Sequence, residues 1–289
     1  MKIREVQIED YIQIKELHDK YNLKILDKAE WSKFWLQNPC MKNSQNIFPM
    51  GWVAEENKRI VCYLGNIPKE YYHDSKRLIV VCSHSWVAEA NYRLQAISLL
   101  DRFFSQKNVD IFTVTTANKI SEQIFKRYDA KKIPSQNYQK PMFVVLDIEK
   151  LIYTFLKYKK IPLTKFISKL FSYFSYIIFY KKLNFWKKIN ISKKVELNST
   201  IDEKFDEFWE AYKLNFQNQF LQSRTSNWIK WHMQNRIANG KAWIMSVSEN
   251  NKILGYAICS ERNNDKIELK RIALIDLVSL KDNQEVYIS

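Results

Sequence analysis

The chain has 289 residues, of which 46% are hydrophobic, and a formal net charge of +15 at pH 7. This length and composition predict a folded protein with room for two cores and exclude a disordered chain. With only four glycines the sequence has no place for a glycine-rich dinucleotide loop or a P-loop, and its four cysteines show no disulfide or zinc spacing.

The N-terminal region carries no secretory signal. Residues 1–7 lack the apolar segment of a signal peptide, and no run in the chain approaches the roughly 20 apolar residues of a membrane span. We therefore expect a cytoplasmic protein with reduced thiols. The four histidines are scattered without the spacing of metal ligands, so no metal site is expected.

The first half of the chain predicts a mixed α/β unit, because apolar residues alternate in some segments and recur at helical spacing in others. A hairpin with an Asn-Lys turn is expected over 52–63, and a buried strand over 78–82. The elements expected after it are an amphipathic helix through 97–104, a strand over 109–116, a helix over 118–128 and a strand over 140–147.

Residues 86–100 join the buried strand to the amphipathic helix. A strand that turns into a helix directs free backbone N–H groups and the positive end of the helix dipole to one point, which suits a phosphate. Any strand-to-helix connection has this geometry, so an unrelated α/β protein is the alternative.

This segment resembles motif A of the Gcn5-related N-acetyltransferases (GNAT), with Trp86, Glu89, Tyr92 and Arg93 at the family's positions. The resemblance implies that the loop holds the pyrophosphate of acetyl-CoA or another acyl-CoA. Ala96 and Ser98 replace two loop glycines, which keeps the backbone N–H groups but limits how closely a ligand can approach. The cofactor-binding residues implied here are Trp86, Val87, Arg93, Leu94, Gln95, Ala96, Ile97 and Ser98.

A second resemblance to the family lies in residues 118–128. It implies that Asn118 and Ser121 contact the pantetheine arm. The family often has a tyrosine four residues after this serine position that protonates the departing thiolate. Phe125 stands there and cannot donate a proton, so Tyr128 is the remaining candidate acid, with a packed ring as the alternative.

Transfer of an acyl group to an amine also needs a base for the ammonium proton. His84 lies on the strand that would run beside the thioester, and a histidine titrates in the right range. Glu89 could serve instead through a water. The structural alternative for His84 is a hydrogen-bonded core residue.

Three segments recur in the same order along the chain, at offsets of 193 to 197 residues. We interpret them as a tandem duplication, with coincidence among amphipathic segments as the alternative. At an offset of 194 the last residue corresponds to Gln95, so the second copy is expected to lack a CoA loop. The matching pairs are 31–38 with 228–235, 52–63 with 243–256, and 76–77 with 270–271.

The repeat divides the chain into a GNAT-like domain over 1–150, a connector over 151–195, and a partial second GNAT-like domain over 196–289. By resemblance to tandem acyltransferases, the second domain would supply residues on the acceptor side of a cleft. These are Arg224, Trp228, His232 and Asp276.

The connector holds eleven lysines and no acidic residue. Apolar residues recur at helical spacing between 163 and 178, and lysines flank this stripe on both sides. One interpretation is contact with an anionic membrane through 157–188, which would make the protein membrane-peripheral. The alternatives are a linker helix packed on the two domains and, ranked last, a nucleic-acid-binding segment.

The sequence thus predicts an α/β (α+β layered) acyl-CoA N-acyltransferase fold, a mixed central sheet flanked by helices, with one full and one partial unit. The resemblance implies transfer of an acyl group, most simply acetyl, from acetyl-CoA to the amine of a small molecule or glycan, such as an amino sugar or a cell-envelope precursor. Two alternatives remain: a degenerate, non-catalytic GNAT-fold binding module, and a Fem-like aminoacyltransferase that binds tRNA through the connector.

Overall fold

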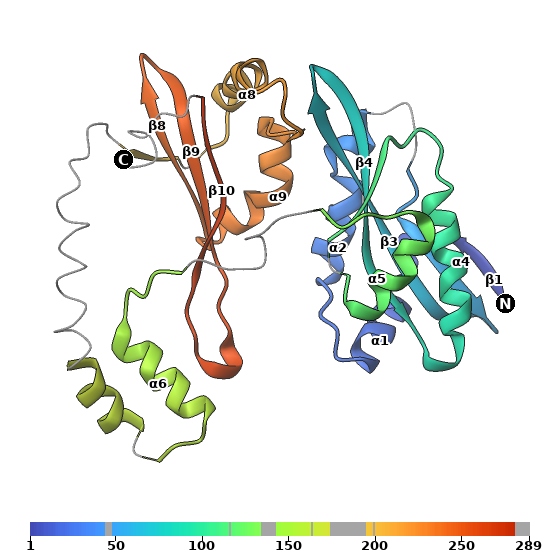
Figure 1. Ribbon diagram of the computed structural model, residues 1–289, viewed down its shortest axis with the longest axis horizontal. Coiled ribbons are helices and arrows are strands. Elements are labelled where there is room, and N and C mark those ends of the chain that lie inside the picture. Colours follow the sequence, from blue (N-terminus) through green and yellow to red (C-terminus); the bar gives the residue numbers. More distant parts are fainter. Residues whose placement is uncertain are drawn as a thin grey trace. The chain divides into compact units, whose positions relative to one another are not determined.

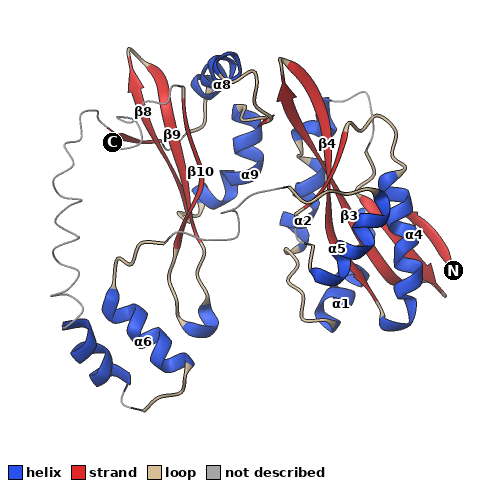
Figure 2. Cartoon of the chain, in the orientation of Figure 1, coloured by secondary structure: helices blue, strands red, loops and turns tan. Residues whose placement is uncertain are grey.

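The computed structural model describes residues 1–43, 48–115, 117–133, 143–162, 164–173, 195–198 and 200–280. The chain forms two compact units, Met1–Lys132 with Trp209–His232, and Ile133–Phe208 with Met233–Ser289. Each unit holds a sheet with helices beside it (Figure 1, Figure 2), which confirms the predicted mixed α/β fold class. The domain boundaries expected at 150 and 195 stay a prediction.

The sheet of the first unit has the strand order β1-β2-β3-β4-β5 and is antiparallel except for the parallel pair β4–β5. A short strand, β7 (Leu221–Gln222), pairs with the end of β3. The other elements are β1 (Lys2–Glu5), η1 (Ile8–Asp10), α1 (Tyr11–Lys20), α2 (Lys28–Leu36), α3 (Pro39–Asn43), β2 (Gly51–Glu56), β3 (Arg59–His73), β4 (Lys76–Ala88), η2 (Ala90–Tyr92), α4 (Arg93–Phe104), β5 (Ile111–Val114), α5 (Lys119–Phe125) and η3 (Lys126–Tyr128).

Helices cover both faces of this sheet, with α1 and α2 on one side and α4 on the other (Figure 1). Successive strand residues point to opposite faces, so β2 and β3 contribute to two cores. We call these the α4-side core and the α1-side core. The α4-side core includes Ala54, Cys62, Leu64, Leu99 and Phe103, and the α1-side core includes Ile14, Trp35, Val53, Tyr63 and Val87.

The sheet of the second unit is antiparallel, with the order β10-β9-β8-β6. Its strands are β6 (Val195–Asn198), β8 (Ala242–Glu249), β9 (Lys252–Glu261) and β10 (Ile272–Ser279). Phe205 and Phe208 of α8 (Glu203–Asn215) pack on Tyr256 of β9 at ring-centroid distances of 5.4 and 5.2 Å. The remaining elements are α6 (Ile148–Tyr158), α9 (Ser226–Ala238) and η4 (Asp265–Ile267).

Both predicted hairpins form, and they turn in the same way. Asn57 and Lys58 join β2 to β3 with φ of 50° and 62°, and two asparagines at 250 and 251 join β8 to β9 with φ of 50° and 63°. Two consecutive positive φ values are the geometry of a type I′ turn, whose twist matches that of the flanking strands. Asparagine tolerates this conformation better than most residues.

The two hairpins have different residues at one corresponding pair of positions. Gly51 pairs with Gly65 in the first hairpin, and Ile244 pairs with Ile258 in the second. A Cβ added at Gly65 would lie 2.7 Å from the Tyr63 hydroxyl oxygen and 2.9 Å from the carbonyl oxygen of residue 84. Glycine is therefore needed in the first unit, because β3 approaches both groups too closely for a side chain.

Two segments differ from expectation. The strand expected over 140–147 is wrong for residues 143–147, where Phe143, Val144 and Leu146 are 68–84% exposed and no described strand pairs with them. Residues 140–142 lie outside the described residues. The helix expected between 163 and 178 is present over 164–173, and residues 163 and 174–178 lie outside the described residues. The helix α6 was not expected. No described helix combines the length and apolarity that crossing a membrane requires.

Candidate active site

The end of β4 has an open edge. β4 pairs with β5 from Val80 to Ser83, where it lies opposite Ile111 to Val114. Beyond that point His84–Ala88 still pair with β3, but no strand among the described residues pairs with their other edge. Backbone N–H and C=O groups along this edge are therefore available to an extended ligand.

A bulge at Ser85 sets which side chains face which core. Ser85 has a φ of 54°, and the pairing of β3 with β4 shifts at this point. An extra residue in one strand reverses the alternation of the side chains. Cys82 therefore faces the same side as His84, whereas Trp86 packs with the α4-side core and Val87 with the α1-side core.

The predicted phosphate loop is helical. α4 begins at Arg93, so the first four backbone N–H groups, those of Arg93, Leu94, Gln95 and Ala96, have no partner within the helix. Arg93 and Leu94 are exposed, and Ile97 and Ser98 are half-buried. The methyl group of Ala96 is 3% exposed in the α4-side core, and the indole of Trp86 donates to the Ala96 carbonyl at 3.1 Å. The Ala96 side chain thus points toward the sheet.

His84 belongs to a cluster of rings that we call the aromatic–histidine cluster. Phe34 of α2 lies 6.2 Å from His84, 5.0 Å from Trp231 and 6.4 Å from His232. Trp228 stacks on Trp231 at 4.6 Å with an interplanar angle of 17°. Three predicted site residues from distant parts of the sequence, His84, Trp228 and His232, therefore meet in one place.

Both histidines of this cluster are held neutral. Burial lowers the pKa of His84 to about 4, with smaller contributions from His18 and Lys69, although part of the side chain stays exposed. Burial and Lys69 likewise lower the pKa of His232 to about 4. Burial disfavours the charged imidazolium, so both rings are neutral at pH 7 and are weak proton acceptors.

Two buried donors accompany the histidines. Trp228 and Trp231 are 2% and 8% exposed, and neither indole N–H has an acceptor among the described residues. An unpartnered buried N–H costs about 1–3 kcal/mol, so such groups usually have a role. A ligand with an oxygen acceptor would supply the missing partner.

Glu89 holds neighbouring elements together. Its carboxylate accepts from Arg59 at 2.8 Å and pairs with Lys20 at 3.1 Å, while its backbone N–H donates to Val61. These contacts tie the start of β3 and the end of α1 to the turn before α4. They engage the oxygens that a general base would need.

Tyr128 lies in the α4-side core and not in the aromatic–histidine cluster. Its hydroxyl donates to Asp101 at 2.6 Å, and its ring stacks on Phe104 at 4.5 Å. Burial and the bond to Asp101 raise its pKa to about 12. Phe125 is 5% exposed and contacts Trp86 at 5.8 Å, so it fills the same core.

Asn118 and Ser121 form the N-terminal cap of α5. The Asn118 side-chain oxygen accepts from the N–H groups of Ile120 and Ser121 at 3.0 and 2.9 Å, and the Ser121 hydroxyl accepts from the Asn118 N–H at 2.9 Å. This reciprocal pair is a capping box, which sequence spacing alone could have indicated.

The two other acceptor-side residues lie elsewhere. Arg224 donates to the Gln222 carbonyl at 3.2 Å and lies 5.7 Å from the ring of Tyr212, in the first unit. Asp276 is on β10 in the second unit and accepts from the Leu277 N–H. Within the described part of the chain, no three His, Cys, Asp or Glu side chains gather as a metal site would require.

Sequence reasoning missed three residues of this site, Phe34, Lys69 and Trp231. The signal for two of them was present: Phe34 and Trp231 occupy corresponding positions in the matching segments 31–38 and 228–235. Nothing in the sequence indicated that these corresponding positions touch. Lys69 lies inside the long strand β3 and gave no local signal.

No family model and no curated protein matches the sequence. Among solved structures, a GCN5-related N-acetyltransferase from Anabaena variabilis matches 99% of this chain and 62% of its own, with 12% identity and a TM-score of 0.56. A conserved protein of unknown function from Enterococcus faecalis, described as a probable N-acyltransferase, matches 99% of this chain and 61% of its own, with 11% identity and a TM-score of 0.57.

A GCN5-related N-acetyltransferase from Kribbella flavida is similar over 99% of this chain and 58% of its own, at 7% identity and a TM-score of 0.54. The chain thus spans about three fifths of the length of the solved structures that it matches. At such low identity the likeness concerns the fold, and this chain has the fold of the GCN5-related N-acetyltransferases.

Proposed function

We propose that the protein is an acyl-CoA-dependent N-acyltransferase that transfers an acyl group, most simply acetyl, to an amine. The observation that carries this proposal is the end of β4, where an open strand edge leads from His84 to the N-terminus of α4. The open edge suits the amide groups of pantetheine, and the helix N-terminus suits the pyrophosphate. Both parts of CoA would thus be held by backbone groups.

His84 is the proposed base. It is neutral, exposed and next to the open edge, so it can reach the acceptor amine, but a pKa of about 4 makes it a weak base. Tyr128 is the proposed proton donor to the thiolate, but a pKa of about 12 makes it a weak one. For Glu89, whose carboxylate holds Arg59 and Lys20, we propose a supporting role.

The aromatic–histidine cluster is the proposed acceptor site. Its ring faces offer flat apolar surface, and the N–H groups of Trp228 and Trp231 could each bind an oxygen of the acceptor. Such a lining fits an amino sugar or a related cell-envelope precursor. Arg224 and Asp276 remain proposed acceptor-side residues.

A tandem origin of the two sheets is part of this proposal. The strand orders β1-β2-β3-β4 and β6-β8-β9-β10 correspond, helices separate the first two strands of each set, and both hairpins have the same turn. The two hairpins also shift register at corresponding positions, after Ala54 and after Val247. The second copy would shape the acceptor side without binding CoA.

Two other functions compete with this one. A non-catalytic binding module is favoured by Phe125, which is buried where the family has an acid. A Fem-like aminoacyltransferase would use the lysine-rich connector for tRNA. Each of these functions is compatible with a cytoplasmic location and with contact between residues 157–188 and a membrane.

Calorimetry with acetyl-CoA tests the proposal. We expect saturable binding that weakens about tenfold or more in Arg93→Glu, because the new carboxylate lies where the pyrophosphate would bind. Arg102→Glu, at the other end of the same helix, is the matched control and should bind normally. No binding heat at millimolar acetyl-CoA would reject the enzyme and favour the binding module.

A further inference from the structure

α6 and the helical residues 164–173 carry a row of exposed apolar side chains in the second unit. Leu151, Phe155 and Tyr158 of α6 recur at helical spacing and are 38–66% exposed. Phe166, Leu170 and Tyr173 recur in the same way and are 49–69% exposed. We call these six residues the apolar stripe. A soluble helix normally turns such a stripe toward a core.

The buried residues of these helices lie between the exposed ones. Thr154 and Leu156 are 3% and 9% exposed, and Ser168 is 1% exposed. α6 therefore packs through a side that is partly polar and leaves its larger rings uncovered. A linker helix packed on the domains predicts the opposite arrangement.

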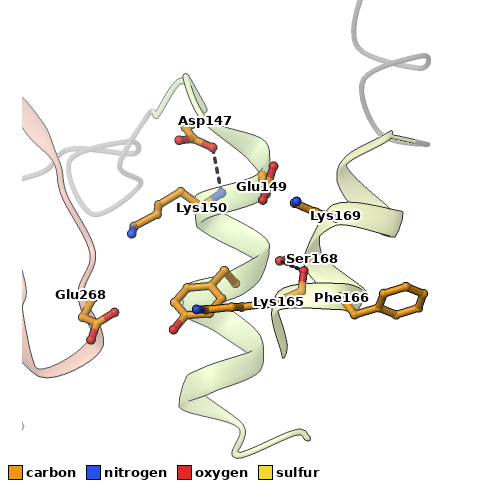
Figure 3. Close-up of a pocket in the computed structure, with 9 residues that line it drawn as sticks. Asp147, Glu149, Lys150, Lys165, Phe166, Ser168, Lys169 and Glu268 are labelled. Atoms are coloured by element: carbon orange, nitrogen blue, oxygen red, sulfur yellow. Dashed lines mark hydrogen bonds between the residues drawn. The ribbon is translucent and has the colours of Figure 1, made fainter. Parts of the chain in front are cut away.

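Charged groups line the space between the two helices, as Figure 3 shows. A cavity of about 690 Å³ lies there, and Lys165 and Lys169 reach into it while the ring of Phe166 points away from α6. Asp147, Glu149, Lys150 and Glu268 complete its charged lining. Six of the nine lining residues are charged, and the rings of Tyr153 and Phe166 also contribute to the lining.

Positive charge accompanies the stripe. The ammonium group of Lys159 lies 6.0 Å from the centre of the Phe155 ring, and the described connector residues 151–162 and 164–173 contain five lysines and no acidic residue. One of the five, Lys157, pairs with Glu268 at 2.5 Å. A protein partner whose surface carries charges of both signs would be attracted only weakly to a segment with positive charges alone. A surface with dense negative charge and an apolar interior matches both features.

We propose that the apolar stripe and its lysines bind the surface of a membrane that contains anionic lipids. The rings of Phe155 and Phe166 enter the boundary between head groups and acyl chains, and the lysines lie at the level of the lipid phosphates. The surface lies apart from the proposed acyltransferase site in sequence and in composition. It therefore holds whether or not the protein binds CoA.

Co-sedimentation of the full chain with vesicles tests this. We expect binding to phosphatidylcholine vesicles with about 30% phosphatidylserine, loss of most of it on raising the salt, and little binding to phosphatidylcholine alone. The double substitution Phe155→Ser with Phe166→Ser should weaken the partition coefficient about 100-fold or more. Leu214→Ser, at an exposed residue of α8, is the matched control and should leave it unchanged.

A second pair of variants isolates the charge. Lys159→Gln with Lys160→Gln, at two exposed positions outside the cavity, should weaken binding about 30-fold, since each lysine near an anionic surface contributes roughly a factor of five. Lys24→Gln with Lys107→Gln removes the same charge from exposed positions of the first unit and should have no effect.

Three results would overturn the proposal: no binding to anionic vesicles at low salt, equal binding by the serine variant, or a concentration-dependent dimer that the serine variant abolishes. The last result would make the stripe an interface between copies of the chain. Binding of RNA in place of vesicles, with the same dependence on Lys159 and Lys160, would count against the membrane as well.

Discussion

The hairpins β2–β3 and β8–β9 have the same turn and the same pairing of position 51 with 65 and of 244 with 258, yet the strands that follow them differ. Both β4 and β10 have an irregular register, but only β4 gains a parallel neighbour among the described strands and leads to the N-terminus of α4. β10 pairs with β9 alone among the described strands. The two hairpins are thus alike, whereas the strands that follow them differ. The candidate active site lies at the end of β4, which is one of these differing strands.

The strongest test of this difference is His84→Gln. The strand register places Asp276 of β10, opposite Ile258, where β4 has His84, opposite Gly65, so the second unit has no histidine at this place. We expect kcat for acetyl transfer to fall about 100-fold or more, with acetyl-CoA binding retained. His73→Gln, at an exposed position on β3, should keep full activity. An unchanged kcat in His84→Gln would remove His84 as the base.

The glycine pair gives the next largest effect. Gly65→Ala places a methyl group against the Tyr63 hydroxyl and the His84 carbonyl, so we expect a loss of about 1–3 kcal/mol in the free energy of unfolding. Chemical denaturation would measure it. Ile258→Val, at the corresponding position of β9, should cost only about 1 kcal/mol. A neutral Gly65→Ala would mean that β3 and β4 can separate without penalty.

Acid should affect the two units differently, because all four histidines lie in the first. Burial lowers the pKa of His18, His84 and His232, so the unfolded chain binds more protons than the folded one between the two pKa values. Their stabilising contribution is complete above about pH 6.5 and is lost as the pH falls toward 4. Hydrogen exchange at pH 7 and pH 4.5 should show that the first unit opens more readily in acid. Equal changes in both units would contradict this.

We expect the smallest change in stability from substitutions that make the turn of the β2–β3 hairpin resemble the turn of the β8–β9 hairpin, or the reverse. Lys58 holds a left-handed conformation with φ of 62°, and the corresponding residue of the second hairpin is Asn251. Lys58→Asn should stabilise the first unit by about 0.5 kcal/mol, because asparagine adopts this conformation at lower cost. Asn251→Lys should cost the second unit a similar amount in chemical denaturation. A destabilised Lys58→Asn would indicate a contact of the lysine that outweighs its backbone cost.

Local patterns predicted much of the fold. The alternation in 52–63 and the Asn-Lys turn specify a hairpin by themselves, and the spacing of Leu100 and Phe103 specifies the buried side of α4. The resemblance to motif A placed β4 before α4 correctly. Each of these signals depends on residues close together in the sequence.

The site required contacts that sequence spacing does not contain. Phe34 meets Trp231 across nearly two hundred positions, and the strained Ser85 that orients His84 is an ordinary serine in the sequence. Asn118 and Ser121 cap α5, and their contact with pantetheine stays a prediction. α6 was missed although Leu151, Phe155 and Tyr158 recur at helical spacing, so its signal was present in the sequence.

The contact between Phe34 and Trp231, at 5.0 Å, joins two positions that correspond in the matching segments. If α2 and α9 descend from one ancestral helix, Phe34 and Trp231 descend from the same residue of that helix, and these two residues are in contact. Such self-contact occurs on the two-fold axis of a homodimer. The aromatic lining of the candidate acceptor site would then have existed before the duplication joined the two copies in one chain. It would have been the interface between two identical subunits.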